Sequence, residues 1–472
     1  MPVLASHNNY IRNQSVATLV LSLGIGGLGL LFSPPSHAET LTALYQRVLA
    51  NDPALSGTES QIDAANARVS EARAALLPSI VVNGQANRSR YAPDKSNSFS
   101  GGSSHSWLTS RQFSEQLSQT IYKPGLWSAL KQSHVMVDAA TAQRDTAYYD
   151  LTVRYSRAYF DVLIADWELS QFQAQKQATL EQLTVAKRSF EVGTVSITDE
   201  KEAEAKYDTV AAQEATAAFD LQAKAALLDE IAGSRVAVTG QHQLVNSLPI
   251  LDVGQFQDWL DVAGTHNPQI IQARYNLDAA ELDTKKAREA YYPTLDATLS
   301  QQNTRNSRQS IGSAVDSGHT WQGGLTLTIP IYEGGGTSAK IREAQALQRK
   351  AEFDLLTAQR TSAQAIRQAF FATLSAMAEF KGMTTAERSA EVALKANQRG
   401  YEVGMRINAD VLDAQSKLFQ ARRDRRRAWY EAWANYTKLK AVAGIFAISD
   451  FIQIDSLLSM RNEPVVEPVH HE

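Results

Sequence analysis

The chain has no cysteine in its 472 residues. It therefore has no disulfides, and it cannot be a lipoprotein acylated on an N-terminal cysteine. It also lacks an excess of positive charge, since 46 lysine and arginine residues stand against 50 aspartate and glutamate residues and the formal net charge is −4. Because nucleic acids attract strongly basic surfaces, this balance argues against nucleic acid as the main partner.

Long apolar runs are almost absent as well. One run, VATLVLSLGIGGLGLLF at residues 16–32, follows the charged residue Arg12 and precedes small residues that end at Ala38. A basic residue, a short apolar run and small residues in this order are typical of a secretory signal peptide. We expect residues 1–38 to be that signal peptide. No second run is long enough for a membrane-spanning helix, so we expect an exported chain without one.

Proline is scarce, with 13 residues, and its positions indicate an internal repeat. Pro53 and Pro268 each begin a helical pattern, whereas Pro78 and Pro293 each end one. Proline fits the first turn of a helix, where its missing N–H costs nothing, and it also fits the position after a helix ends. We therefore expect two structural repeats, at 39–248 and 249–446, and a C-terminal segment and tail at 447–472.

Each repeat carries alternating segments after its closing proline. The segment LTLTIPIY (325–332) places leucine and isoleucine on one face and threonine on the other, and FSEQLSQTIY (113–122) alternates less regularly. A period of two residues indicates β-strands. We expect strand pairs within 79–123 and 294–332, with connecting loops rich in serine, glycine and asparagine at 88–112 and 303–320.

Two long runs without proline follow the strand pairs. They are rich in alanine, glutamine, glutamate, lysine, leucine and arginine, which favour helix. Each run is broken once, by RSFEVGTVSITD (188–199) and by RGYEVGMRINAD (399–410). In both breaks a glycine can end one helix and an aspartate can begin the next. We expect two long helical hairpins, at 125–232 and 336–444, with these breaks as their tips.

The helical runs and the strand pairs favour different functions. By composition and periodicity alone, the runs fit a coiled-coil rod, and a soluble periplasmic coiled-coil scaffold or adaptor without a pore is one interpretation of the chain. The strands favour another, because an isolated hairpin is marginally stable and leaves its edges open. Strands from several copies of an exported chain can instead close into one barrel with an apolar, lipid-facing side.

The order of these features resembles the TolC family of outer-membrane efflux and secretion ducts. The resemblance is carried by ARAALLPS (72–79), by the duplicated strand pairs and hairpins, and by the F/Y-E-V-G motif at both tips. It extends over residues 44–446. The tips are closest to those of the member after which the family is named.

This resemblance implies an α+β membrane protein that works as a homotrimer. Each chain would contribute four β-strands to a twelve-stranded β-barrel in the outer membrane of a Gram-negative bacterium. The antiparallel coiled-coil helices would form a periplasmic α-barrel tunnel, with an equatorial belt that draws on 234–265 and the C-terminal segment. The implied partners are outer-membrane lipid, a periplasmic adaptor and an inner-membrane ABC or proton-driven pump. The implied function is passive conduction of small molecules or unfolded proteins.

Positions that match the family's motifs imply a periplasmic gate at the tips. Tyr401 and Arg406 would reach toward Thr198 and Asp199, where an arginine–carboxylate pair holds at rest but can be broken by a partner. The alternative is that Asp199 only caps its own helix and that Arg406 is solvated.

Two carboxylates follow the second tip on one helical face. Asp410 and Asp413 are three residues apart, and three copies would set up two rings of carboxylates that favour cations. The resemblance implies that these rings line a pore constriction. The alternative is helix capping and solvation. The resemblance also implies that the tips dock the adaptor through Val192, Gly193, Thr194, Val403 and Gly404. Met405 departs from the motif at the second tip.

Signals of catalysis are missing. The sequence contains no recognisable nucleophile set, phosphate loop or metal spacing, so we expect no enzyme, no cofactor and no metal site. The basic stretch ARRDRRRAWYEAW (421–433) lies on the helix that returns from the second tip. Its arginines spread over several faces, so we expect a solvated or intersubunit role for them.

Overall fold

The computed structural model describes residues 40–91, 106–236, 253–308 and 317–459. All of them belong to one compact unit, Ala38–Glu472. The predicted signal peptide, the end of the C-terminal tail, and parts of the predicted loops and of the equatorial belt lie outside the described residues.

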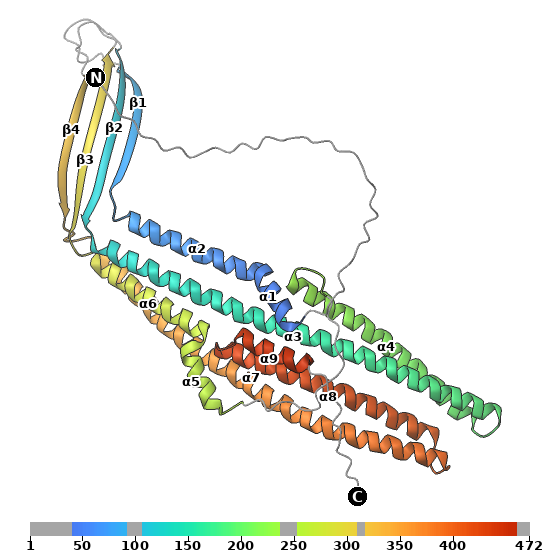
Figure 1. Cartoon of the computed structure of the whole chain (residues 1–472). Helices are drawn as coiled ribbons and strands as arrows, with labels where there is room; N and C mark the ends of the chain where they lie inside the picture. Colours follow the sequence, from blue (N-terminus) through green and yellow to red (C-terminus); the bar gives the residue numbers. More distant parts are fainter. Residues whose placement is uncertain (1–39, 92–105, 237–252, 309–316, 460–472) are drawn as a thin grey trace, which may run out of the picture. The chain divides into compact units, whose positions relative to one another are not determined.

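The described elements occur twice in nearly the same lengths (Figure 1). In chain order they are α1 (Leu41–Asn51), α2 (Pro53–Ala74), β1 (Ser79–Tyr91), β2 (Ser106–Tyr122), α3 (Pro124–Glu191), α4 (Ile197–Ala232), α5 (Phe256–His266), α6 (Pro268–Glu289), β3 (Thr294–Arg308), β4 (Ser317–Thr328), α7 (Gly336–Glu402), α8 (Asn408–Ala443) and α9 (Ile448–Ser459). Helices α2 and α6 both have 22 residues, α3 and α7 have 68 and 67, and α4 and α8 both have 36. The predicted two-fold repeat is confirmed.

The same local signals start the equivalent helices. Pro53 and Pro268 are the first residues of α2 and α6. The Asp52 carboxylate accepts one N–H from the first turn of α2 at 2.8 Å, and the Asn267 side chain accepts two from α6 at 2.9 and 3.1 Å. These caps satisfy N–H groups that have no partner within the helix. No helix in the described ranges combines the length and the apolarity needed to cross a membrane.

The strands form one antiparallel sheet in the order β1-β2-β3-β4. The pairing of β2 with β3 joins the two repeats, for example where Leu117 lies opposite Leu299. The strands extend into the segments expected as loops, because backbone pairing continues from Arg88 opposite Thr109 to Tyr91 opposite Ser106. The expectation of a loop over all of 88–112 is therefore wrong at both ends.

The last strand ends earlier than the alternation indicated. Strand β4 stops at Thr328, whereas the alternating pattern continued to Tyr332. Pro330 follows closely and has no N–H to donate to a neighbouring strand, which explains the stop.

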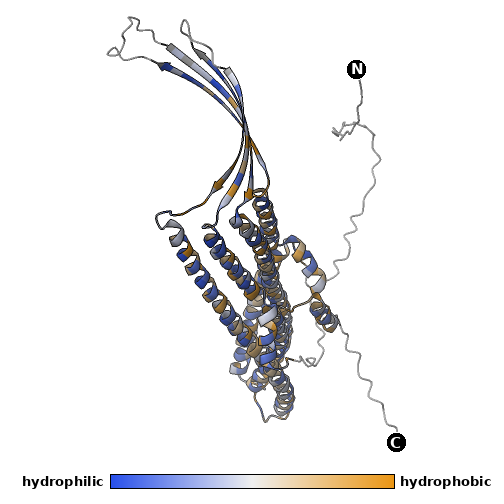
Figure 2. Cartoon of the chain, turned by 90° about the vertical axis from the view of Figure 1, so that its left-hand side faces the viewer, coloured by the Kyte–Doolittle hydropathy of each residue, from blue (hydrophilic) through white to orange (hydrophobic). Residues whose placement is uncertain are grey.

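The sheet leaves apolar side chains uncovered on the single chain. Ile80 is 75% exposed, and Leu325 and Leu327 are also exposed. In Figure 2 the apolar residues of the strands gather in the part of the sheet next to the helices. No helix of the described residues covers either face of the sheet (Figure 1). An uncovered apolar surface of this kind indicates contact with lipid or with another chain.

The main hydrophobic core lies around the middle of α3, where α1, α8 and α9 pack. Its largest fully buried side chains include Tyr45, Tyr155, Phe451, Trp429 and Trp433. The carboxylate of Asp455 in α9 accepts the backbone N–H groups of Leu41 and Thr42 at 2.9 and 2.8 Å, so α9 caps the N-terminus of α1.

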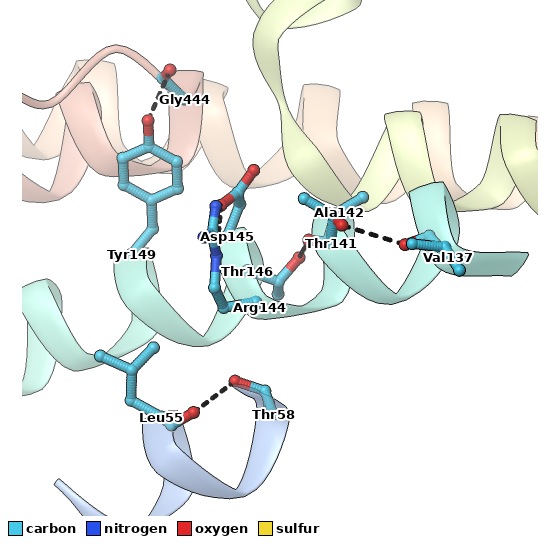
Figure 3. A network of polar contacts seen from close by, with 10 residues as sticks. All are labelled: Leu55, Thr58, Val137, Thr141, Ala142, Arg144, Asp145, Thr146, Tyr149 and Gly444. Carbon is cyan, nitrogen blue, oxygen red and sulfur yellow. Dashed lines mark hydrogen bonds and ion pairs between the residues drawn. The ribbon is translucent and has the colours of Figure 1, made fainter. Parts of the chain in front are cut away.

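Hydrogen bonds fix the C-terminal end of α8 to this core. The Tyr149 hydroxyl of α3 donates to the Gly444 carbonyl at 2.9 Å (Figure 3). The Asn267 side-chain amide donates to the Val442 carbonyl at 2.7 Å. Gly444 has a φ of 78°, and a Cβ there would overlap the backbone carbonyl of His266. The second hairpin is therefore held firmly where α8 ends, at the end opposite its tip.

Candidate functional site at the hairpin tips

The two tips share one backbone structure. Each begins with a glycine in the left-handed region, Gly193 at φ 80° and Gly404 at φ 76°. The preceding valine donates to the arginine four residues earlier at 3.2 Å in both tips, and each glycine N–H donates to the carbonyl of Phe190 or Tyr401. These bonds satisfy the last carbonyls of α3 and α7, as expected for a glycine that ends a helix.

Side-chain capping stabilises the first tip. The Ser196 hydroxyl accepts the N–H of Thr198 at 3.2 Å, and the Asp199 carboxylate accepts the N–H of Ser196 at 3.1 Å. The two side chains therefore form a capping box at the start of α4. The Thr194 hydroxyl donates to the Ser189 carbonyl at 2.9 Å and fastens the turn to the end of α3.

The second tip has no side-chain cap. Ile407 occupies the position before α8, and no side chain caps the helix there. Asp410, which corresponds to Asp199, accepts instead from the Arg406 guanidinium at 3.5 Å. The stem of Arg406 lies against Gly400, where an added Cβ would approach the arginine Cγ to 2.7 Å.

The predicted gate residues lie at the tips, but the single chain does not join them. Thr198 is exposed, and Asp199 and Tyr401 are partly exposed. Among the described residues, no hydrogen bond or ion pair links Tyr401 or Arg406 to the first tip. Within one chain Asp199 caps its helix, as the alternative stated, whereas Arg406 pairs with Asp410. The gate stays a prediction.

The predicted ring carboxylates share one face of α8. Asp410 and Asp413 line a cleft of about 400 Å³ between α7 and α8. The Asp413 carboxylate lies 2.7 Å from the Lys417 ammonium, one turn further along the helix. Lys417 carried no role in the sequence interpretation, although its spacing of four residues from Asp413 is a signal of an ion pair.

The residues predicted to dock an adaptor form the apolar ends of the hairpins. Val192 is 74% exposed and Val403 is 65% exposed. Exposed valines at the end of a helical hairpin are available to a partner, but the structure contains no partner chain, so docking stays a prediction.

Near the tips, the two hairpins touch through a small apolar cluster. Leu183 and Ala186 of α3, Ala203 of α4 and Leu412 of α8 are buried together, and Tyr207 packs against them. The second hairpin therefore leans on the first through a few side chains here, far fewer than in the main core.

The basic stretch 421–433 has a role that the sequence interpretation missed. Arg426 is 2% exposed and lies with its guanidinium 4.1 Å from the centre of the Trp167 ring. Arg423 stacks over Phe172 at 4.2 Å and donates to Gln175 at 3.1 Å. These contacts join α8 to α3 within one chain, so the expectation of a solvated or intersubunit role for these two arginines is wrong.

The environment of these arginines explains how they remain buried. Burial lowers the pKa of the Arg426 guanidinium, while its neighbour Tyr430 acts in the opposite direction. Arg427 pairs with Glu168 of α3, and Arg425 lies 2.6 Å from Glu387 of α7. Guanidinium groups tolerate such sites because they are weakly hydrated and stack on aromatic rings. Only the packing of α8 on α3 shows which arginines meet aromatic rings.

Relatives and solved structures share this architecture. The sequence matches the family described as outer membrane efflux protein over residues 44–234 and 259–444. It is 30% identical to the outer membrane protein TolC of Escherichia coli, over 94% of this chain and 90% of that protein. It is 26% identical to the proteases secretion protein PrtF of Dickeya chrysanthemi, over 94% of each chain.

The fold agrees with a solved channel. The crystal structure of the Campylobacter jejuni CmeC outer membrane channel matches with a TM-score of 0.72 at 18% identity, over 89% of each chain. The family match covers most of the sequence, and both hairpins and all four strands of the sheet fall within it. The chain therefore belongs to the outer membrane efflux protein family.

Proposed function

We propose that this chain is the outer-membrane exit duct of an export machine and that it works as a homotrimer. It conducts small molecules or unfolded proteins passively from an inner-membrane ABC or proton-driven pump, which a periplasmic adaptor connects to the duct. The family membership supports an efflux role, and the similarity to a proteases secretion protein supports protein export as well.

One observation carries the proposal. A four-stranded sheet with exposed apolar side chains and unpaired outer strands stands at one end of two long helical hairpins (Figure 1). Strands β1 and β4 each pair on one side only among the described residues. Three such sheets joined edge to edge close into a barrel, which pairs the open edges and turns one apolar face to lipid.

The tips form the closed end of the duct in this proposal. Arg406 and Tyr401 of the second tip meet Thr198 and Asp199 of the first tip when the chains assemble. For Arg406 this means exchanging its weak, exposed contact with Asp410 for one with Asp199, and neither contact is strong in a wet channel. Such a gate yields to the binding energy of a partner at the exposed Val192 and Val403.

Asp410 and Asp413 form two stacked carboxylate rings just above the gate. Because both face an open cleft in the single chain, no packing has to change for them to line a passage. Rings of carboxylates favour cations.

Fractionation of the envelope tests the duct. The proposal predicts that the full chain sediments with the outer membrane in a sucrose gradient and that cross-linking gives a band of three chains. A chain found wholly in the soluble periplasmic fraction would contradict the proposal and favour a periplasmic scaffold.

Conductance tests the gate separately. The Arg406→Ser and Tyr401→Phe double variant should raise single-channel conductance in planar bilayers, because both donors to the first tip are lost. Arg399→Ser is a matched control, since it removes an arginine from the same tip outside the proposed gate. Equal conductance in the double variant and the wild-type protein would reject these residues as the gate.

A further inference from the structure

Four charged residues form a single stripe at the second tip and the start of α8. Arg406 lies in the turn just before α8, and Asp410, Asp413 and Lys417 lie in the helix at spacings of three and four residues. These spacings keep the three helical residues on one side of a helix with 3.6 residues per turn. All four residues line the same cleft between α7 and α8. Read along the chain, the signs are positive, negative, negative and positive.

The stripe is electrically balanced within each chain. Arg406 lies 3.5 Å from Asp410, and Lys417 lies 2.7 Å from Asp413. The hydrogen bond with Asp413, together with the charge of that carboxylate, raises the pKa of Lys417. The lysine is therefore a cation at neutral pH.

The two ion pairs differ in whether they take part in the proposed gate. Arg406 has a second role, because it is also the residue that reaches toward the first tip. Lys417 lies more than two turns further into the helix, and both members of its pair are largely exposed to the cleft. The opposite wall of the cleft consists of small residues of α7, including Ser389, Ala390, Ala393 and Asn397. Nothing on that wall replaces the charge of Lys417.

We propose that Lys417 sets the ion preference of the duct by supplying a fixed positive charge beside the Asp413 ring. The inference rests on the proposed function, in which Asp410 and Asp413 line the constriction. In a trimer, the three Lys417 ammonium groups offset the charge of the three carboxylates in the Asp413 ring. The ring of Asp410 then carries the cation preference, and it does so most strongly when Arg406 has turned to the first tip.

This effect does not require a strong ion pair. Exposed pairs open and close and contribute little to stability. The ammonium nevertheless stays within a few ångströms of the ring, which is less than the Debye length of about 10 Å at 0.1 M salt. Its charge therefore acts on a permeating ion whether or not the pair is formed.

The reversal potential across a planar bilayer with a KCl gradient measures this preference in the full-length duct. Lys417→Gln should raise the ratio of K⁺ to Cl⁻ permeability by about threefold, because three charges near the passage are removed. Lys417→Glu should raise it further, and Lys417→Arg should leave it at the wild-type value. The side chain is exposed, so all three variants should assemble as the wild-type protein does.

Lys395 provides a matched control. It pairs with Glu391 at 3.0 Å with the same spacing of four residues, on α7 near the same tip. It lies two residues from Ala393 of the cleft wall, about 200° around the helix, and it does not line the cleft. Lys395→Gln should leave the permeability ratio unchanged. An equal shift in this variant would overturn the assignment to Lys417.

The Asp410→Ala and Asp413→Ala double variant separates the two possible failures. If it leaves the permeability ratio unchanged, the proposed constriction is wrong and the inference falls with it. If the double variant lowers cation preference but Lys417→Gln has no effect, the constriction stands and the role of Lys417 is wrong.

Discussion

The two hairpin tips have the same backbone and use equivalent aspartates in different ways. Gly193 and Gly404 turn the chain with nearly the same φ, yet Asp199 completes a capping box and Asp410 does not. Two neighbouring positions differ, because the first tip has Val195 and Ser196 where the second has Arg406 and Ile407. The second tip therefore lacks the capping hydroxyl and gains a guanidinium, and Asp410 pairs with that guanidinium.

This comparison explains how two tips with the same backbone can take different parts in one gate. The first tip is the more rigid, because both of its capping groups are bonded to its own backbone. The second tip carries a long cationic side chain that lies against Gly400 and is held only by an exposed pair. We therefore expect the second tip to change more when the duct opens, and the predictions below test that asymmetry.

Substitution of the turn glycines should have the largest effect on amide hydrogen exchange, and the effect should be equal at both tips. Gly193→Val and Gly404→Val each force a β-branched residue into the left-handed region, which costs about 1–2 kcal/mol. Amide hydrogen exchange of the adjoining turns, measured by mass spectrometry, should accelerate by about tenfold for each 1.4 kcal/mol by which the turn is destabilised. A large effect at one tip and none at the other would show that the backbones are not equivalent in solution.

The next effect should distinguish the tips. Ser196→Ala removes a helix cap and should destabilise the first turn of α4 by about 1 kcal/mol. Ile407→Ala at the equivalent position should leave the exchange of α8 nearly unchanged, because Ile407 caps nothing. Similar exchange in the two variants would contradict the account of the capping difference.

A helix cap introduced into the second tip should make the two tips more alike in amide hydrogen exchange. Ile407→Ser recreates the sequence of a capping box with Asp410 and should slow exchange at the start of α8, with a gain of about 0.5–1 kcal/mol. It should also draw Asp410 away from Arg406. The control is Ile407→Thr with Asp410→Ala, which keeps a hydroxyl but cannot complete the box. If Ile407→Ser gains no more than this control, the box has not formed.

The smallest effect should be the coupling of Arg406 to Asp410. A double-mutant cycle with Arg406→Gln and Asp410→Asn should give at most about 0.3–0.5 kcal/mol, the usual value for an exposed pair four residues apart, because Arg406 turns to Asp199 in the closed duct. Thermal unfolding of the detergent-solubilised protein measures it. A coupling several times larger would mean that Arg406 is too firmly held to serve a gate.

Much of this arrangement could be predicted from the sequence, for reasons that differ between elements. The prolines at 53 and 268 and the glycines of the tips act locally, so their positions indicated where helices begin and end. The strands were predicted less well, because polar segments such as Arg88–Tyr91 are held by pairing with a distant strand. Pro330, by contrast, was a local signal for the end of the strand, but the prediction followed the alternating pattern past it.

The parts that could not be predicted depend on packing between helices. Arg426 is as basic as its neighbours in the sequence, and only the arrangement of α8 against α3 places it on Trp167. The capping difference at the tips was visible as serine against isoleucine. The pairing of Asp410 with Arg406 could not be predicted from it, because that pairing depends on where the arginine side chain lies in the structure.

The central claim is that the second tip meets the first to close the duct, and the absence of cysteine allows a direct test. An Asp199→Cys and Arg406→Cys pair in the assembled duct, treated with a bifunctional thiosulfonate reagent whose spacer replaces the length of the arginine side chain, should become cross-linked and lose single-channel conductance, and a reductant should restore it. Each single variant should show neither effect. Failure to form the cross-link in the closed duct, or full conductance after it has formed, would contradict the claim.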